Sequence, residues 1–299
     1  MQFKRIKRPV SGVLLLDKPV GYSSNQALQC AKRLFQAAKA GHTGNLDPFA
    51  TGLLPLCFGE ATKFSQTLLD ADKIYRATLK LGATTSTGDT EGEITSTAPV
   101  KVSPQDIQRV LQAFTGEIAQ TPPMHSALKH QGKPLYEYAR AGVEIERKSR
   151  NVHIYALQLD HFEGDQAVIT VSCSKGTYIR VLAEDIGRTL GCGAHLTGLR
   201  RLATGGFLLE QAITLDELEA LNASDRDQRL LPVDALLKDL PQVELDDNSA
   251  HYFQQGQPIW KSGNPDTTGL LRVYQSSGRF LGLGEMQDGR IAPKRLLVT

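Results

Sequence analysis

Residues 40–64 read AGHTGNLDPFATGLLPLCFGEATKF, and the fold and function of the chain are interpreted outward from this stretch. It places one carboxylate, Asp47, in a glycine-rich loop, with Pro48 directly after it and His42 five residues before it. Glycines allow tight turns, and a residue that precedes proline is pushed towards extended geometry. A single carboxylate presented in this way favours nucleophilic chemistry or charge stabilisation over the paired acids of ordinary glycoside hydrolysis.

The same residues also fit a purely structural role. Asp-Pro ahead of an apolar run is a common helix start, with Asp47 as the N-cap and Pro48 at the first helical position. Because capping aspartates are far commoner than nucleophiles, the pattern alone predicts a short helix after the loop. The two roles are compatible, since a helix N-terminus would keep Asp47 ionised.

The sequence on either side predicts a mixture of strands and helices. A buried apolar run, alternating patterns and a hairpin predict strands at residues 12–16, 74–83, 152–159 and 167–173. Capping patterns predict helices that begin at Ser23 or Ser24, at Ser103 and at Thr214, and a further helix follows Gly176. From residue 269 onward, short strands with glycine turns predict a small β-rich unit.

Six segments occur in the order of a known family: GVLLLDKPVGYSSN (12–25), GHTGNLDPFATGLL (41–54), KFSQTLLDADKIYRATLKLG (63–82), PPMHSALKHQGKPLYEYAR (122–140), CSKGTYIRVLAEDIG (173–187) and LGCGAHLTGLRR (190–201). In these segments the chain resembles the bacterial tRNA pseudouridine-55 synthases, the TruB family. Several motifs in the right order are much more specific than any one of them.

The resemblance implies an α+β fold in two domains. The first is a pseudouridine synthase catalytic core with a large, mainly antiparallel mixed sheet flanked by helices, and the second is a small β-rich C-terminal domain similar to the PUA type. We expect the catalytic domain at residues 1–245, with residues 122–150 as an insertion that clamps RNA. The PUA-like domain is then expected at residues 246–299.

The resemblance also implies an isomerase that converts uridine 55 in the T loop of tRNA to pseudouridine, after flipping that nucleotide out of the loop. Asp47 matches the catalytic aspartate, which either attacks the ribose C1′ or assists bond cleavage and later abstracts a proton from C2′. Tyr75 matches a tyrosine that stacks on the base, and Arg180 matches an arginine that pairs with the aspartate. The family uses no cofactor and no metal.

The remaining matches are expected to bind the substrate. His42 would contact the RNA and hold flipped nucleotides, Tyr178 and Leu199 would line the base pocket with Tyr75, and Lys18 and Lys63 would lie at the rim. Each also has an ordinary interpretation from the residues alone, as a core side chain or a solvated group.

Charge is unevenly distributed along the chain, although the net charge is only +2. Residues 122–150 hold six basic and three acidic side chains, whereas residues 210–247 hold eleven acidic and three basic ones. The basic segment could follow a phosphate backbone, while such runs are also typical of solvated faces.

The four cysteines are scattered, which favours reduced thiols in the cytoplasm over a disulfide framework or a zinc site. The sequence shows neither a signal-peptide pattern nor an apolar run long enough to span a membrane. We therefore expect a cytoplasmic protein. The resemblance implies that it acts on tRNA without a guide RNA, and nothing in the sequence requires more than a monomer. A guide-RNA-directed relative of the dyskerin type, an RNA chaperone and a hydrolase that releases uracil stay open as alternatives.

Overall fold

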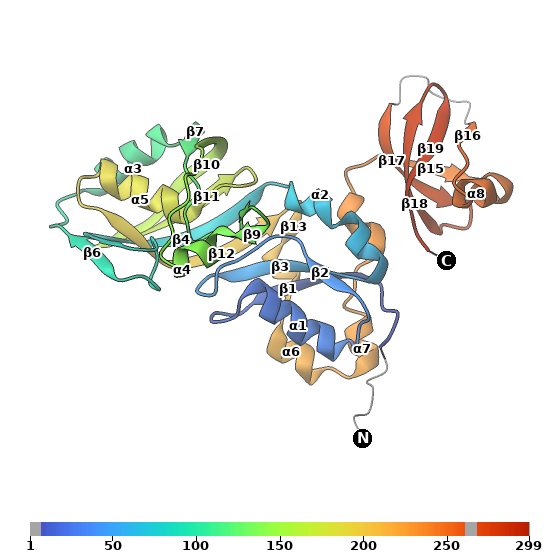
Figure 1. Cartoon of the computed structure of the whole chain (residues 1–299), viewed down its shortest axis with the longest axis horizontal. Helices are drawn as coiled ribbons and strands as arrows, with labels where there is room; N and C mark the ends of the chain where they lie inside the picture. The colour runs from blue at the N-terminus through green and yellow to red at the C-terminus, as the bar shows by residue number, and fades with distance from the viewer. Residues whose placement is uncertain (1–6, 261–267, 299) are drawn as a thin grey trace.

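A computed structural model describes residues 7–260 and 268–298 (Figure 1). Its main sheet has ten strands in the order β14–β1–β3–β12–β4–β11–β10–β7, with β13 paired to β12 and β2 paired to β3. Only the β1–β14 and β3–β12 pairs are parallel, so the prediction of a large, mainly antiparallel mixed sheet is confirmed. The strands are β1 (Gly12–Lys18), β2 (Ala40–His42), β3 (Thr51–Phe58), β4 (Lys73–Leu81), β7 (Gly116–Gln120), β10 (Arg150–Glu163), β11 (Gln166–Cys173), β12 (Ala194–Thr204), β13 (Phe207–Leu208) and β14 (Ile213–Thr214).

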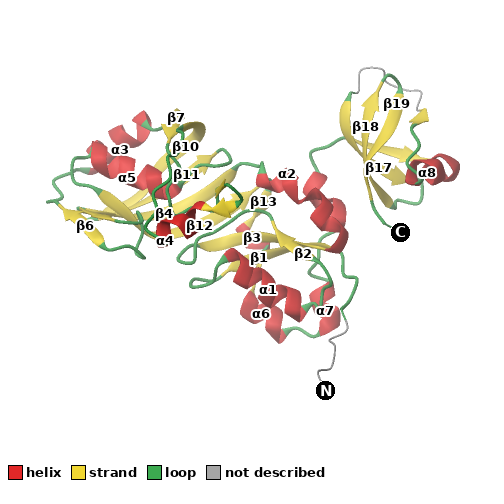
Figure 2. Cartoon of the chain, viewed as in Figure 1, coloured by secondary structure: helices red, strands yellow, loops and turns green. Residues whose placement is uncertain are grey.

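Helices cover this sheet at its two ends (Figure 2). α3 (Pro104–Ala113) and α5 (Ile179–Thr189) pack together at one end, and α1 (Ser24–Leu34) packs with α6 (Leu215–Ala220) at the other. Ser23, Ser103 and Thr214 each form a reciprocal capping box, which confirms the three predicted helix starts. The other elements are α2 (Ser65–Leu69), α4 (Leu135–Arg140), α7 (Ala223–Asp227), the 3₁₀ helices η1 (Gly59–Phe64), η2 (Leu209–Gln211) and η3 (Val233–Leu237), and the hairpins β5 (Ala83–Thr85) with β6 (Ile94–Thr97) and β8 (Lys129–His130) with β9 (Lys133–Pro134).

The prediction of a short helix after Asp47 is wrong. Residues 47–50 form a single turn, closed by a 3.1 Å hydrogen bond from the Ala50 amide to the Asp47 carbonyl, and the chain then enters β3. β3 lies between β1 and β12 and is buried along almost its whole length. A continuous apolar run of this length fits a two-sided buried strand as well as a helix, and here the pairing partners decide.

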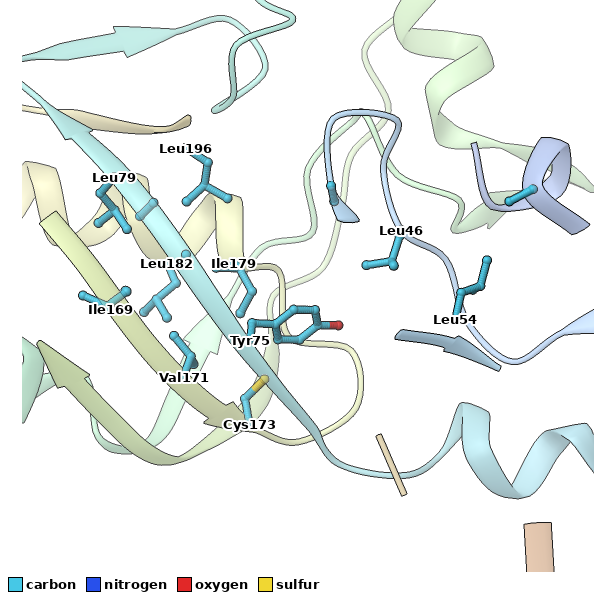
Figure 3. Packing of buried hydrophobic residues seen from close by; sticks show 14 of the residues in the cluster. Leu46, Leu54, Tyr75, Leu79, Ile169, Val171, Cys173, Ile179, Leu182 and Leu196 are labelled. Atoms are coloured by element: carbon cyan, nitrogen blue, oxygen red, sulfur yellow. The ribbon is translucent and has the colours of Figure 1, made fainter. Parts of the chain in front are cut away.

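The core lies between the sheet and its helices, and β4 contributes one of its faces (Figure 3). Alternate residues of β4 are buried, which confirms the predicted alternation. Tyr75 lies on this buried face with Leu79, beside Val171 of the neighbouring strand β11 and Ile179 of α5 (Figure 3). The core thus continues up to the side chains that line the site described below.

A second sheet of five strands stands apart from the first, in the order β15–β17–β18–β19–β16 (Figure 1). Its elements are β15 (Gln242–Leu245), α8 (Asp247–Gln254), β16 (Ile259–Trp260), β17 (Gly269–Gln275), β18 (Phe280–Gln287) and β19 (Arg290–Leu296), and they enclose a hydrophobic cluster of their own. This curled sheet confirms the predicted β-rich second unit. β15 pairs in parallel with β17, so residues 242–245, which the expected boundary assigns to the catalytic domain, lie in the second sheet.

Candidate active site

A cavity of about 850 Å³ opens at the loop that carries Asp47. Pockets for small ligands measure roughly 300–1,000 Å³, so this one is large enough for a nucleotide. The structure brings six of the eight predicted site residues to it, from four separate segments of the chain: His42, Asp47, Tyr75, Tyr178, Arg180 and Leu199.

The Asp47 loop is held in place from both sides. The Ser24 hydroxyl of α1 accepts a 2.7 Å hydrogen bond from the Leu46 amide and donates a 3.1 Å bond to the Leu46 carbonyl. On the other side, the Thr43 amide and hydroxyl both donate to the Pro55 carbonyl at 3.2 Å. Because these bonds flank Asp47, its carboxylate projects into the cavity from a fixed backbone.

Arg180 at the start of α5 joins Asp47 to a second carboxylate. Its Nη2 lies 3.0 Å from Asp47 Oδ2, and its Nη1 lies 3.5 Å from Asp89 Oδ2. Nη1 also donates to the Thr87 carbonyl at 3.1 Å and Nη2 to the His125 carbonyl at 2.7 Å. Arg180 is 5% exposed and Asp47 38%, so the guanidinium is a buried anchor while the Asp47 carboxylate stays open to the cavity.

Two opposing effects act on the Asp47 carboxyl. Its position on the cavity floor raises its pKa above the ordinary value near 3.8, and the negative charge of Asp89 adds to that rise. The charge of Arg180, its hydrogen bond and the more distant charge of Lys18 lower the pKa. Arg180 therefore favours the ionised form of a carboxylate that burial would otherwise tend to protonate.

Tyr75 forms the wall of the cavity beside Asp47. The residue is 9% exposed, and its hydroxyl points towards the loop that carries Leu46 (Figure 3). Burial raises the pKa of Tyr75, whereas the nearby positive charge of Arg201 lowers it. The Tyr75 ring can stack on a planar ligand, and its hydroxyl can bond a polar substituent of that ligand.

Tyr178 and His42 complete the lining from opposite sides. The backbone amide of Tyr178 donates to Gln120 Oε1 at 3.0 Å, and Gln120 Nε2 donates back to the Tyr178 carbonyl at 3.3 Å. The Arg150 guanidinium lies 5.2 Å from the centre of the Tyr178 ring, an arrangement typical of a cation–π contact. Burial lowers the pKa of His42, and its Nδ1 has no hydrogen-bond partner among the described residues.

The two predicted rim lysines do not line the cavity. Lys18 is fully buried, and its ammonium donates to the carbonyls of Pro19 at 2.9 Å and Tyr22 at 2.5 Å. Burial lowers the pKa of Lys18 to about 8. Lys63 of η1 instead donates to Glu60 at 2.6 Å and to the Leu296 carbonyl of β19 at 2.8 Å.

Three buried charged residues at the site were not among the predicted ones: Asp89, Lys73 and Arg201. Asp89 lies between glycines in STGDTEG, Lys73 stands two residues before Tyr75, and Arg201 ends the LTGLRR motif. Their burial signals their importance, because only 1% of Asp89, 8% of Lys73 and 1% of Arg201 is exposed. The sequence does not predict that they lie near Asp47, because only the folded sheet brings these distant segments together.

The described residues contain no cluster of three or more His, Cys, Asp or Glu side chains suited to a metal ion. Among the described residues, none of the helices has the length and apolar character to cross a bilayer.

Comparisons with known families cover almost the whole chain. Residues 32–179 match the family model described as TruB family pseudouridylate synthase (N terminal domain). Residues 180–238 match the tRNA pseudouridylate synthase B C-terminal domain, and residues 241–297 match Pseudouridine synthase II TruB, C-terminal.

Individual proteins give the same result. The chain is 61% identical to the tRNA pseudouridine synthase B of Methylobacillus flagellatus over 298 residues, which is 99% of this chain and 98% of the relative. It is 60% identical to the protein of the same name from Thiobacillus denitrificans, over 99% of each chain.

Among solved structures, a chain of a Cbf5-Nop10-Gar1 complex superposes with a TM-score of 0.70 at 26% identity, covering 95% of this chain and 84% of that one. A chain of an H/ACA RNP bound to a substrate RNA containing 2′-deoxyuridine superposes with a TM-score of 0.72 at 24% identity, covering 96% and 85%. These superpositions confirm the predicted fold of the catalytic core.

Proposed function

The chain belongs to the TruB family of pseudouridylate synthases, and from this we infer that it is an isomerase, a tRNA pseudouridine synthase that acts on uridine 55 of the T loop. Its relatives carry the name tRNA pseudouridine synthase B over nearly their full length. The observation that carries the assignment of the site is the Asp47–Arg180 pair, which leaves an ionisable carboxylate open to a nucleotide-sized cavity.

In this proposal Asp47 is the group that acts on the ribose of the target uridine. An anchored carboxylate suits either attack on C1′ or assistance to cleavage of the glycosidic bond followed by proton abstraction from C2′. Arg180 keeps that carboxylate ionised and fixes its direction, because one guanidinium nitrogen is bonded to Asp47 and the other is held by Asp89 and a carbonyl. The freed base then rotates and is rejoined through C5.

Tyr75, Tyr178 and Leu199 would hold the extruded base. Flipping a uridine out of a folded loop costs a few kcal/mol of lost stacking, which contacts in the pocket must offset. The buried ring of Tyr75 and the apolar side chain of Leu199 offer such contacts on the cavity wall. His42 would face the neighbouring nucleotides. Lys18 and Lys63 have no part in this proposal, because the ammonium group of each donates to backbone carbonyls.

The basic segment 122–150 would clamp the T arm. Its helix α4 brings Tyr136 and Arg140 to the cavity, and the Arg140 guanidinium lies 5.4 Å from the centre of the Tyr136 ring. RNA recognition of this kind uses loop shape, phosphates and splayed bases, which a basic and aromatic surface suits. We further propose that the RNA-binding second domain begins before Gln242, and that the enzyme works as a cytoplasmic monomer without a guide RNA.

The first test is tritium release from a tRNA transcript labelled at C5 of its uridines. Joining the base through C5 expels that hydrogen, so we expect about one equivalent per tRNA, and none when uridine 55 is replaced by cytidine. Asp47→Asn should reduce the rate by at least roughly 10³-fold, as removal of an essential catalytic group does, while the Kd for tRNA stays within about threefold. Binding of the transcript without release in the unmodified protein would overturn the proposal in favour of a tRNA chaperone, and release of free uracil would indicate a hydrolase.

A further inference from the structure

Arg201 lies in the middle of the main sheet, at the point where the Asp47 loop and the Tyr75 strand meet. On β12 it is the register partner of Tyr75 in antiparallel β4 and of Gly52 in parallel β3. Directly opposed residues of antiparallel strands project from the same face of the sheet. Arg201 and Tyr75 accordingly both line the cavity, and each is buried.

The guanidinium of Arg201 is anchored on β3, the strand that follows the Asp47 loop. Its Nε donates a 2.6 Å hydrogen bond to the Leu53 carbonyl, six residues after Asp47. Its Nη1 lies 3.7 Å from where a Cβ on Gly44, three residues before Asp47, would stand. The guanidinium therefore lies close to the chain both before and after Asp47.

This buried cation lacks the usual acidic partner. The neighbouring Arg200 pairs with Asp17 at 2.6 Å, whereas no described carboxylate lies within ion-pair distance of Arg201. Its Nη2 is also without an acceptor at good hydrogen-bond geometry among the described residues. An uncompensated buried charge costs stability, so its presence at a cavity indicates a role in the function.

We propose that Arg201 is a positioning residue for Tyr75: anchored on the Leu53 carbonyl, it directs an uncompensated positive charge and a donor at the Tyr75 phenol oxygen. The inference rests on the proposed function, in which Tyr75 lies against the target base. The Nη2 donor has no acceptor among the described residues, and we expect it to bond the phenol oxygen when the base enters, as catalytic hydrogen bonds often form only in the complex.

The charges around the phenol support this role. Burial and the nearby Cys173 and Asp47 all raise the pKa of Tyr75, and Arg201 is the group that opposes them. The planar guanidinium can bond the Leu53 carbonyl and the phenol at the same time. A lysine carries the same charge on a single nitrogen and cannot make both bonds in the geometry of the planar guanidinium.

The test is a double-mutant cycle with Arg201→Met and Tyr75→Phe, read as the single-turnover rate of tritium release at saturating tRNA. We expect Arg201→Met to slow release at least roughly tenfold when Tyr75 is present, and less than about threefold in the Tyr75→Phe background. The Kd for tRNA should change less than about threefold. Arg200→Met, on the adjacent residue, is the matched control and should leave the rate near that of the unmodified enzyme.

A second readout does not depend on activity. Tyrosines are replaced by 3-fluorotyrosine, and the ¹⁹F resonance of residue 75 is identified by its loss in Tyr75→Phe. Arg201→Met should raise the pH at which this resonance titrates, while Arg200→Met should not. If circular dichroism shows that Arg201→Met does not fold, Arg201→Gln, which also removes the charge but keeps a polar end, takes its place in both experiments.

The outcomes separate the two proposals. Equal rate losses in both backgrounds, or an unchanged titration midpoint, overturn the role of Arg201 and leave the synthase assignment intact. Absence of tritium release from the unmodified enzyme overturns the assignment of function, and the ¹⁹F titration then decides the role of Arg201 alone.

Discussion

At the scale of single residues, the two carboxylates at the site depend on a single positive charge. Asp89 and Asp47 share one guanidinium, so the charge of each carboxylate affects the other. Asp89 is additionally fixed by the Thr87 hydroxyl at 2.5 Å and the Glu91 amide at 3.0 Å. Its charge affects Asp47 both directly and through the shared Arg180.

Asp89→Asn should shift the acid limb of the pH–rate profile to lower pH. The negative charge of Asp89 raises the pKa of Asp47, so its removal lets Asp47 stay ionised in more acidic solution. The same change breaks a buried ion pair and should destabilise the fold by about 3 kcal/mol. The measurements are single-turnover rates between pH 4.5 and 8, chosen around the carboxyl range, and urea unfolding.

Asp185→Asn serves as the control for that experiment, because Asp185 pairs with the exposed Arg188 of α5 instead. An acid limb that stays in place in Asp89→Asn, or one that moves equally in the control, would contradict the coupling of the two carboxylates.

Lys18 makes stability depend on pH in the alkaline range. Its folded-state pKa of about 8 lies below the ordinary value of 10.5, so between these values the unfolded chain binds more protons. The free energy of unfolding therefore rises with pH from about 8 to 10.5, with a contribution from Lys18 of at most about 1.4 kcal/mol per pH unit. Urea unfolding at pH 8, 9 and 10 should show a shallower rise in Lys18→Met, and an equal slope would contradict the argument.

Some of these residues could be predicted from the sequence and others could not. Asp47 and Arg180 lie in motifs with family-specific spacing, and the structure brings them to 3.0 Å. Lys18 lies in such a motif too, but the motif does not reveal that the ammonium turns inward onto carbonyls. The roles of Asp89 and Arg201 cannot be predicted from local sequence, because their partners are distant in the chain. Asp89 pairs with Arg180, and the sheet register places Arg201 opposite Tyr75.

At the scale of elements, the close approach of β3 and β12 defines the floor of the site. Gly52 opens β3 with φ of 102°, and a Cβ added there would stand 2.4 Å from the Arg201 carbonyl oxygen. The contact leaves no room for any side chain, so this glycine is needed both for its backbone conformation and for its size.

Gly52→Ala should therefore be more damaging than the same change at Gly116, which has the same φ of 102° but nothing within 4 Å of the added Cβ. The backbone strain alone costs about 1–3 kcal/mol, and we expect that loss for Gly116→Ala. Gly52→Ala should lose more than its control and should also reduce activity, because the clash displaces Arg201. Equal losses in urea unfolding would show that strain, not the strand contact, dominates.

Local signals predicted the helices better than the strands. α1, α3 and α6 begin at capping boxes that can be read directly from Ser23, Ser103 and Thr214. The sequence of β3 predicts a helix wrongly, because its apolar and polar residues do not alternate. They do not alternate because the strand is buried on both faces. Its conformation is set by β1 and β12, whose positions no local pattern reveals.

At the scale of the whole molecule, the second sheet is attached to the catalytic core by a mixed contact. The Phe280 ring of β18 lies 5.8 Å from the Phe64 ring of η1, centre to centre. Beside it, the Tyr274 hydroxyl donates to Asp234, and Arg272 Nε donates to the Leu240 carbonyl at 3.1 Å. The two units are therefore held together by apolar packing edged with polar bonds.

Phe280→Ala should weaken this attachment. Truncating a large aromatic side chain in a core costs about 3–5 kcal/mol, and we expect somewhat less here because Phe280 is only partly buried. Leu270→Ala on the same sheet is the control, since that side chain is 44% exposed and should change stability by less than about 0.5 kcal/mol. Urea unfolding and limited proteolysis between residues 238 and 242 would measure the effect, and equal sensitivity of both variants would contradict it.

Lys63 and Glu60 are bonded to residues 296 and 298, so this contact can form only after synthesis on the ribosome is nearly finished. Lys63 is synthesised 233 residues before the Leu296 carbonyl that it binds. At about 5–20 residues per second, that interval lasts on the order of 10–50 s. During it, the apolar surface around Phe64 has no cover from β18 and β19, so the catalytic core is completed while this surface is still open to aggregation.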